Sequence, residues 1–237
     1  MPNNRSITSI SLGVTGDGDS VPVRRTFSFA NLNGNVERFE ARCELQRLRG
    51  IMSWIEEVKV SEAEGKLAET YAALIKQRGK VSNILKVHSL NPDAMGNHLD
   101  LYMTIMFGKS GLSRAEREAI AVVVSANNDC DYCVNHHAEA LRRYIKDEEI
   151  VNLLMSADGL ETLEPRLSNI VRHAEKLTTA PGAMTESDLG ELRSEGLSDS
   201  DILDITLIVG YFNFVNRIAL GLGVDFSDDE MSGYLND

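Results

Sequence analysis

The sequence predicts an all-α fold. From about residue 52 onward, apolar residues recur at spacings of three and four, capping residues open the segments, and strand patterns are nearly absent. We expect seven or eight helices joined by short connections, with no internal repeat. Residues 52–237 are predicted to form one folded domain.

The first two helices of this domain are indicated by their starting residues. Ser61 precedes a segment whose apolar face includes Leu67 and Leu74. Pro92 fits the first turn of another helix that runs through Met106.

Later helices are marked by capping boxes, in which a Ser or Thr precedes an acidic residue by three positions. These pairs are Ser113 with Glu116, Thr185 with Asp188, and Ser198 with Asp201. The β-branched run at residues 119–124 would also suit a buried strand, but the capped segment leading into it favours a buried helix. Residues 201–221 are apolar on several sides, so we expect that helix to be enclosed by its own domain or by a neighbouring subunit.

Residues 1–51 differ from the rest of the chain. They are rich in Ser, Gly, Asn and Asp, and the first 50 contain seven Arg, no Lys and five acidic residues. Such a segment buries too little apolar surface to offset the entropy of ordering it. We predict a disordered or poorly ordered extension.

The overall charge excludes several classes of partner. With 24 Lys and Arg against 36 Asp and Glu, the formal net charge is −12, which does not favour nucleic acid or anionic lipid. No uninterrupted apolar stretch reaches the ~20 residues of a membrane helix, and no signal or transit peptide is visible. Three cysteines are too few for a disulfide framework. We expect a soluble, cytoplasmic protein.

One segment contains the residues that are best suited to take part in a reaction. Cys130, Cys133 and His137 are separated by three and four positions, so a single helix would place them on one side. Glu118 lies on the preceding predicted helix. Residues 127–129, Asn-Asn-Asp, are good cap residues, which would put the cysteine pair in the first turn. A helix start stabilises a thiolate there.

These residue types predict a redox dithiol. One thiolate would attack a peroxide or a disulfide, and the second cysteine would resolve the sulfenic acid or mixed disulfide that results. His137 would relay a proton, while Glu118 would act as a base or orient a water molecule.

Two other interpretations of the pair remain. The cysteines could be small core residues, or Cys130, Cys133 and His137 could bind zinc, with His136 or Glu118 as a fourth ligand. A structural zinc site usually has a second ligand cluster, and none accompanies the other histidines. We therefore expect neither a metal nor a cofactor.

Two further polar residues are assigned structural roles. His136 points about 100° away from His137 on a helix, which indicates a rim position or a subunit contact. Arg217 stands among apolar residues, where it would need a carboxylate partner or a subunit contact.

The stretches LSRAEREAIAVVVSANNDCDYCVNHHAEAL and YFNFVNRIALGLGV resemble the AhpD-like and carboxymuconolactone decarboxylase-like family, in particular its uncharacterised peroxidase-related (alkylhydroperoxidase) subgroup. The likeness runs from about residue 52 to 225. The family's active-site pattern matches at Glu118, Cys130, Cys133 and His137. Some members carry a second histidine between the cysteines, where this chain has Tyr132.

The resemblance implies an AhpD-like helical bundle, assembled as a homo-oligomer (trimer or hexamer), that reduces small hydroperoxides with a thiol or dithiol reductant. By analogy Cys133 attacks and Cys130 resolves, although helix-end electrostatics alone favour Cys130 as attacker. The broader family also suggests a decarboxylase acting on a small lactone acid. That chemistry does not use a cysteine pair, so the presence of both cysteines favours the peroxidase.

Overall fold

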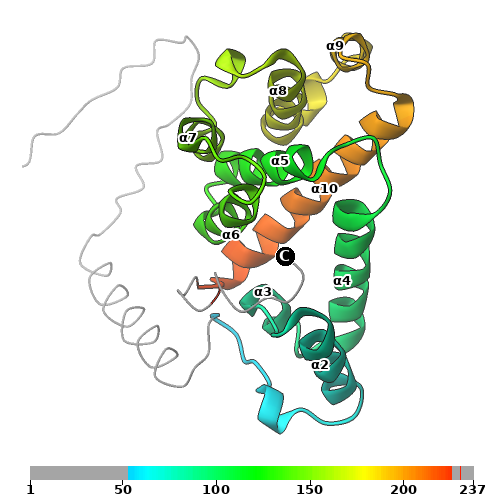
Figure 1. Cartoon of the computed structure of the whole chain (residues 1–237). Coiled ribbons are helices and arrows are strands. Elements are labelled where there is room, and N and C mark those ends of the chain that lie inside the picture. The colour runs from blue at the N-terminus through cyan, green and yellow to red at the C-terminus, as the bar shows by residue number, and fades with distance from the viewer. Residues whose placement is uncertain (1–52, 226–229, 231–237) are drawn as a thin grey trace, which may run out of the picture. The chain divides into compact units, whose positions relative to one another are not determined.

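The computed structural model describes residues 53–225 and residue 230. These residues contain nine α-helices and no strand, which confirms the all-α prediction (Figure 1). The predicted extension at residues 1–51, which includes Cys43, lies outside the described residues, so that expectation stays a prediction.

The longer helices are α2 (Gly65–Arg78), α4 (Pro92–Phe107), α5 (Arg114–Asn127), α6 (Asp131–Leu141), α8 (Pro165–Thr179) and α10 (Asp199–Leu222). The shorter ones are α3 (Asn83–Lys86), α7 (Glu148–Ser156) and α9 (Glu186–Ser194). Single 3-10 turns lie between them at η2 (Val60–Glu62), η3 (Leu160–Thr162) and η4 (Pro181–Ala183). The expected seven or eight helices were too few because the short α3 has no clear periodicity.

Most predicted helix starts are confirmed. All three capping boxes are formed, at α5, α9 and α10. Pro92 begins α4, and the preceding Asn91 side chain accepts a hydrogen bond from the Ala94 N–H. The start at Ser61 was wrong. Ser61 lies in η2, the two residues after η2, Ala63 and Glu64, are extended, and α2 begins only at Gly65.

Helix α5 is the centre of the domain. Every residue from 117 to 125 is buried, and the helix packs against α6, α7, α8 and α10. The β-branched run at 119–124 is therefore a buried helix, as its capped start predicted. Its branched side chains fill the space between the surrounding helices.

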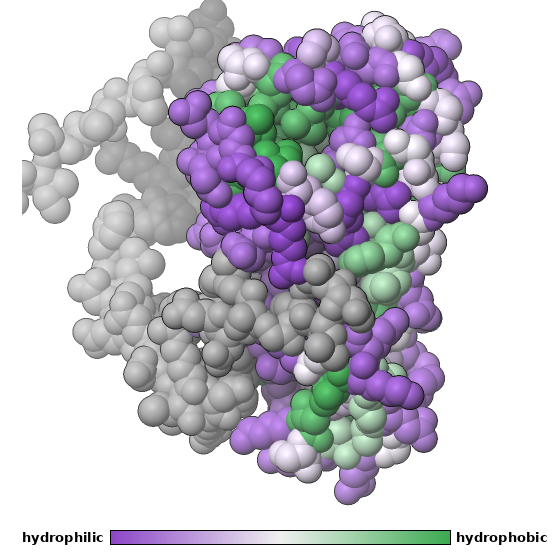
Figure 2. Space-filling model, in the orientation of Figure 1, coloured by the Kyte–Doolittle hydropathy of each residue, from purple (hydrophilic) through white to green (hydrophobic). Residues whose placement is uncertain are grey.

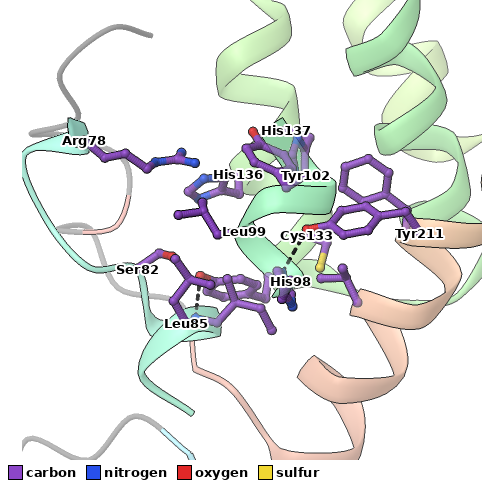
Figure 3. A pocket seen from close by; sticks show the side chains of 14 residues that line it. Arg78, Ser82, Leu85, His98, Leu99, Tyr102, Cys133, His136, His137 and Tyr211 are labelled. Carbon is purple, nitrogen blue, oxygen red and sulfur yellow. Dashed lines mark hydrogen bonds between the residues drawn. The ribbon is translucent and has the colours of Figure 1, made fainter. Parts of the chain in front are cut away.

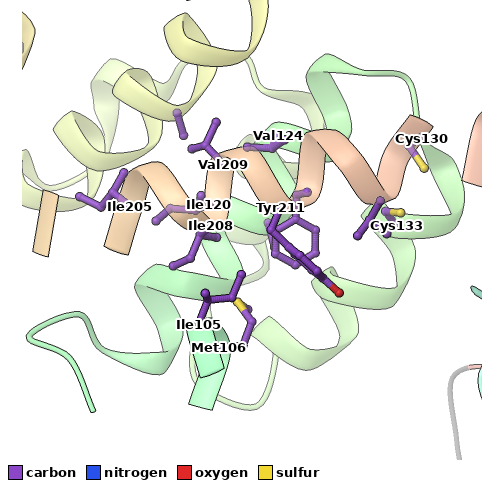
Figure 4. Close-up of a cluster of buried hydrophobic side chains, with 14 of the residues drawn as sticks. Ile105, Met106, Ile120, Val124, Cys130, Cys133, Ile205, Ile208, Val209 and Tyr211 are labelled. Atoms are coloured by element: carbon purple, nitrogen blue, oxygen red, sulfur yellow. The ribbon is translucent and has the colours of Figure 1, made fainter. Parts of the chain in front are cut away.

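Helix α10 crosses the domain as its longest helix and buries one face against α4, α5 and α8. Figure 4 shows Ile205, Ile208 and Val209 meeting side chains of α4 and α5 there. The described residues do not enclose the opposite face, since Leu203 is 56% exposed and Phe214 is 49% exposed, so the expected cover by a neighbouring subunit stays a prediction. By length and composition alone α10 could cross a membrane, a property it shares with core helices of soluble proteins.

A smaller apolar cluster lies at the other end of the domain, where α2 packs against α4. It consists of Leu67, Tyr71, Leu74, Val81, Leu85 and Met95. Hydrophilic residues cover much of the face in Figure 2, and apolar residues form separate patches on it. The candidate site lies where this cluster meets α6 and α10.

Candidate functional site

The two cysteines lie at the turn that joins α5 to α6. Asp129 adopts a left-handed conformation with φ of 52°, and the Cys130 N–H donates to the Ser125 carbonyl at 3.0 Å. Cys130 is itself the N-cap of α6, which places Cys133 in its first turn. The expected cap at residues 127–129 was therefore wrong, because Asn128 instead ends α5.

The two cysteines are buried free thiols, with exposures of 1% and 2%. Cys133 donates hydrogen bonds to the Cys130 sulfur from its thiol and its backbone N–H, and together these outweigh burial and lower the pKa of Cys130. The same thiol contact, together with burial, raises the pKa of Cys133 well above its usual value. Cys130 therefore ionises more easily than Cys133, because Cys133 holds the proton of the hydrogen bond between the two sulfurs.

A chain of hydrogen bonds from α5 and α10 leads to the cysteine pair. The Asn128 amide donates to the Asn216 oxygen at 2.9 Å, and the Asn216 amide donates to the Ser125 hydroxyl at 3.1 Å. Asn216 also forms hydrogen bonds to the sulfurs of both cysteines, and Ser125 forms one to the sulfur of Cys133. Each of these hydrogen bonds lowers the pKa of the cysteine concerned and so favours its thiolate. Asn216 is fully buried, and these contacts satisfy its polar atoms.

Glu118 and His137 form a buried pair beside the cysteines. The Glu118 carboxylate has no exposed surface and lies 2.7 Å from His137 Nδ1. Arg114 donates to the other carboxylate oxygen at 2.5 Å while its guanidinium stacks on the Phe107 ring. Burial alone would raise the pKa of Glu118, but His137 and Arg114 outweigh it and lower this pKa.

The tautomer of His137 follows from this pairing. An ionised carboxylate only accepts hydrogen bonds, so His137 Nδ1 must carry the hydrogen that it shares with Glu118. Its Nε2 is then the ring nitrogen that can exchange a proton with another group. Because His137 lines a pocket, that exchange can take place with a bound molecule.

A pocket that encloses about 470 Å³ of empty space, open solvent included, lies beside the site (Figure 3). Cys133 and His137 line it, whereas Cys130 does not. The other walls come from α2, α3, α4, α6 and α10 and from the segment between α2 and α3. They are Arg78, Ser82, Ile84, Leu85, His98, Leu99, Tyr102, Tyr132, His136, Tyr211, Phe212 and Val215.

His136 is half-buried and lines the pocket, and its ring stacks on that of Tyr132 with centroids 6.0 Å apart. Burial, followed by the charge of His137, lowers the pKa of His136 to about 3. The spacing along the chain could not show that this side of α6 faces a pocket. The predicted subunit contact of His136 stays a prediction.

Tyr132, between the cysteines, is tied to distant parts of the chain. Its hydroxyl donates to the Glu230 carboxylate at 2.7 Å and accepts the Ile84 N–H at 3.2 Å. Glu230 also accepts the Asn83 N–H at 3.0 Å. Tyr132, at the position where some family members have histidine, thus connects the cysteine turn to α3 and to Glu230 near the C-terminus.

The zinc alternative finds no site in the part of the chain that the structure describes. No group of three or more His, Cys, Asp or Glu side chains there is arranged to hold a metal ion. Arg217 is exposed and donates to the Asn213 carbonyl and side-chain oxygens, so the expected carboxylate partner is absent from its described contacts. Its predicted subunit contact stays a prediction.

Comparison with known proteins supports one family. Residues 92–174, which include Glu118, both cysteines and His137, match the carboxymuconolactone decarboxylase family. This match and the solved structures below support similarity to the AhpD-like and carboxymuconolactone decarboxylase-like family. An uncharacterized peroxidase-related protein of Silicibacter sp. TM1040 is 29% identical in sequence, with a TM-score of 0.68, over 76% of this chain and 95% of that one.

Two further proteins are similar to this chain. The AhpD-core, uncharacterized peroxidase-related protein of Ralstonia eutropha JMP134 is 26% identical with a TM-score of 0.68, over 76% of this chain and 95% of that one. The uncharacterized protein YdfG of Bacillus subtilis is 23% identical over 143 residues, which are 60% of this chain and 96% of that protein. These similarities support the AhpD-like fold and an enzymatic role related to peroxidases.

The structure brings the four predicted site residues to one place and adds partners that the sequence analysis missed. The carboxylate of Glu118 is contacted by Arg114, and the cysteine sulfurs are contacted by Ser125 and Asn216. The pocket is also lined by His98 and Tyr211. The signal for Asn216 was an amide within an otherwise apolar helix. The other residues had no local signal.

Proposed function

We propose that this protein is a dithiol peroxidase that reduces small alkyl hydroperoxides. The observation that carries the proposal is the position of Cys133. Its sulfur lies at the wall of a pocket, is hydrogen-bonded to Cys130, and belongs to a residue one helical turn before His137. This arrangement contains a nucleophile, a resolving thiol and a proton carrier within reach of one bound molecule.

In the first step, the Cys133 thiol gives its proton to Nε2 of His137, and Glu118 stabilises the imidazolium that forms. The thiolate then attacks the terminal oxygen of the hydroperoxide. An S–O bond forms, the O–O bond breaks, and the leaving alkoxide takes the proton from His137 to give the alcohol. Sulfur is oxidised by two electrons to a sulfenic acid, and the peroxide is reduced by two.

In the second step, Cys130 attacks the sulfenic sulfur. An S–S bond forms, the S–O bond breaks, and hydroxide leaves with the Cys130 proton as water. A thiol or dithiol reductant then returns the disulfide to two thiols by exchange. A reducing compartment such as the cytosol would supply this reductant.

We assign Cys133 as the attacking cysteine because of its position at the pocket, not because of its pKa. Cys130 has the lower pKa, which by itself favours it as nucleophile. Only Cys133 lines the pocket, however, so a bound hydroperoxide meets its sulfur first. The two thiols share a proton, and moving that proton to Cys130 or His137 exposes the Cys133 thiolate.

The decarboxylase alternative has less support. The geometry at the pocket is built around the cysteine pair, with Asn216 and Ser125 directed at the sulfurs. A decarboxylase of this family would leave that arrangement without a use.

We also propose a homo-oligomer, a trimer or hexamer, that covers the exposed apolar stripe of α10. The stripe consists of Leu203, Leu207 and Phe214, each at least 43% exposed. Light scattering of the full chain would test this assembly, and a monomer at micromolar concentration would contradict it.

A single-turnover experiment tests the peroxidase. The reduced full chain is treated with one equivalent of cumene hydroperoxide, and thiols are counted before and after. We expect two thiols to be lost, 2-phenyl-2-propanol to appear, and mass spectrometry to locate a Cys130–Cys133 crosslink. Turnover should continue when dithiothreitol is supplied.

Three serine variants make the test specific. Cys130→Ser should stop at a sulfenic acid on Cys133 that dimedone traps, and Cys133→Ser should lose turnover to background. Cys43→Ser is the matched control, because it removes the third cysteine and leaves the pair intact. Undiminished turnover in Cys133→Ser would falsify the proposal, whereas dimedone labelling on Cys130 in that variant would reverse the order of the cysteines.

A further inference from the structure

Arg78 brings a positive charge to the pocket, and the peroxidase chemistry proposed above does not use it. It is the last residue of α2, and in Figure 3 its side chain points toward His136. Its guanidinium carbon lies 5.2 Å from the centroid of the Tyr102 ring, which also lines the pocket. No Lys, Asp or Glu is among the described residues that line this pocket.

The charge of Arg78 reaches side chains on three other helices. Burial has the largest influence on the pKa values of Tyr102, His136 and Tyr211, raising those of the two tyrosines and lowering that of His136. The charge of Arg78 acts to lower all three pKa values. These residues lie on α4, α6 and α10, and all three line the pocket. Arg78 is therefore within electrostatic reach of the pocket interior.

A continuous row of rings joins Arg78 to the proposed reaction site. The Tyr102 ring lies 6.0 Å from that of Tyr211, and the Tyr211 ring lies 5.1 Å from that of Phe212. Phe212 in turn makes a T-shaped contact with the His137 ring at 4.6 Å. We call Tyr102, Tyr211 and Phe212 the ring wall, and all of them line the pocket. A ligand that lies along the ring wall meets a cation at one end and the reacting groups at the other.

The two ends of the ring wall select different chemical groups. A guanidinium presents parallel N–H donors that match the two oxygens of a carboxylate, and its single charge balances one negative charge. Apolar ring faces favour a hydrocarbon body between the two ends. A phosphate dianion would keep an uncompensated charge, because Arg78 is the only permanently charged type of residue among the described lining residues.

We propose that the pocket takes a hydroperoxide whose far end is a carboxylate, with Arg78 binding the carboxylate and the ring wall contacting the apolar body. The hydroperoxide group then lies at Cys133 and His137. This substrate class rests on the proposed function, which supplies the reacting group. Binding of the carboxylate itself requires no turnover.

Two unreactive probes of matched length test the carboxylate site. Octanoate and octanamide have the same hydrocarbon chain and differ in the charge of the head group. We expect the reduced full chain to bind octanoate about tenfold more tightly at pH 7.5, as measured by ligand-detected NMR titration. Equal affinities, or no binding of either probe, would overturn the proposal. Tighter binding of octyl phosphate than of octanoate would overturn the choice of a carboxylate.

Competition with a hydroperoxide tests whether the probe occupies the pocket. Octanoate should raise the KM for cumene hydroperoxide, and octanamide should do so only at about tenfold higher concentration. An unchanged KM at an octanoate concentration that saturates the titration would show that octanoate binds elsewhere, and would overturn the proposal.

Variants of Arg78 separate its charge from its shape. Arg78→Met keeps an unbranched stem and removes the charge, so octanoate and octanamide should then bind with equal affinity. Arg78→Lys keeps the charge without the planar fork and should retain part of the preference. Arg172→Met, at an exposed position of α8, is the matched control and should bind both probes as wild type does. A full preference in Arg78→Met would contradict the assignment.

The unmodified protein provides a test that no folding defect can obscure. In ¹⁵N-arginine-labelled protein, the Nε–H signal of Arg78, assigned by its loss in Arg78→Lys, should shift with octanoate and not with octanamide. An unchanged signal at saturating octanoate would contradict the proposal. If octanoate binds with the expected preference while hydroperoxide causes no thiol loss, the carboxylate site stands and the peroxidase does not. Thiol loss without any preference for octanoate would remove only the substrate class.

Discussion

Two histidines of the same pocket, His137 and His98, have opposite environments. His137 donates from Nδ1 to the ionised Glu118 carboxylate, which Arg114 also holds, so a charge on this ring would be compensated. His98 accepts at Nε2 from a neutral phenol and stays uncharged, with a pKa lowered to about 3. The partner of the ring, rather than the residue type, decides which histidine can carry a proton.

The difference separates a ring that can carry a charge from one that stays neutral. The His137 side offers a proton carrier next to the proposed nucleophile, whereas the His98–Tyr211 pair is a neutral hydrogen bond between α4 and α10. Changes at the first pair should therefore affect turnover, and changes at the second should affect stability.

The largest effect is expected from Glu118→Gln. An amide cannot stabilise an imidazolium as a carboxylate does, so kcat of the proposed peroxidase should fall by about 10²- to 10⁴-fold. Steady-state kinetics measure this change. Glu139→Gln, on the outer side of α6, is the control and should behave as wild type. Wild-type turnover in Glu118→Gln would contradict the role of the carboxylate.

Next in size is the effect of Arg114→Met on stability. Removing this guanidinium leaves the buried Glu118 charge with His137 alone, which should cost about 3 kcal/mol of the free energy of unfolding. Urea denaturation at pH 7.5 gives the value. The control Arg193→Met removes an exposed ion pair with Asp199 and should cost less than about 1 kcal/mol. Similar losses in both variants would show that burial of the pair matters little.

A smaller effect is expected from Tyr211→Phe. This change leaves Nε2 of His98 without its donor and should lower the free energy of unfolding by about 1–2 kcal/mol. Histidine NMR should then show a mixture of His98 tautomers, with His137 unchanged. Tyr144→Phe, at a half-exposed site, should leave both properties as in wild type. A single unchanged tautomer would show that Tyr211 does not fix the ring.

The last effect, and the smallest per group over a single pH unit, is a pH dependence of stability. His98 and His136 have pKa values lowered from 6.5 to about 3 in the folded protein, so protonation favours the unfolded chain. Their contribution is complete above pH 6.5 and is lost as the pH falls toward 3, by about 1 kcal/mol per group over the first unit. Denaturant midpoints across this range should show the loss, and His98→Gln should reduce it. A flat profile would contradict the buried neutral state.

Much of the fold was accessible from the sequence because its determinants are local. The three capping boxes depend on residues three positions apart, and each starts a helix where predicted. The predicted helix start at Ser61 was wrong. Serine can cap a helix, but Ser61 lies in a 3-10 turn, and extended backbone follows that turn. Whether the domain itself or a neighbouring subunit encloses α10 could not be predicted, because apolarity does not specify which partner covers a face.

The sequence by itself determined that Cys130, Cys133 and His137 share one side of a helix, because helical geometry converts spacings of three and four into proximity. Only the tertiary structure decided that Asn216 reaches the sulfurs and that His98 meets Tyr211, 113 residues away. Those contacts depend on how α4, α5 and α10 pack. The packing also sets the burial and the partners that decide which of these groups can hold a charge.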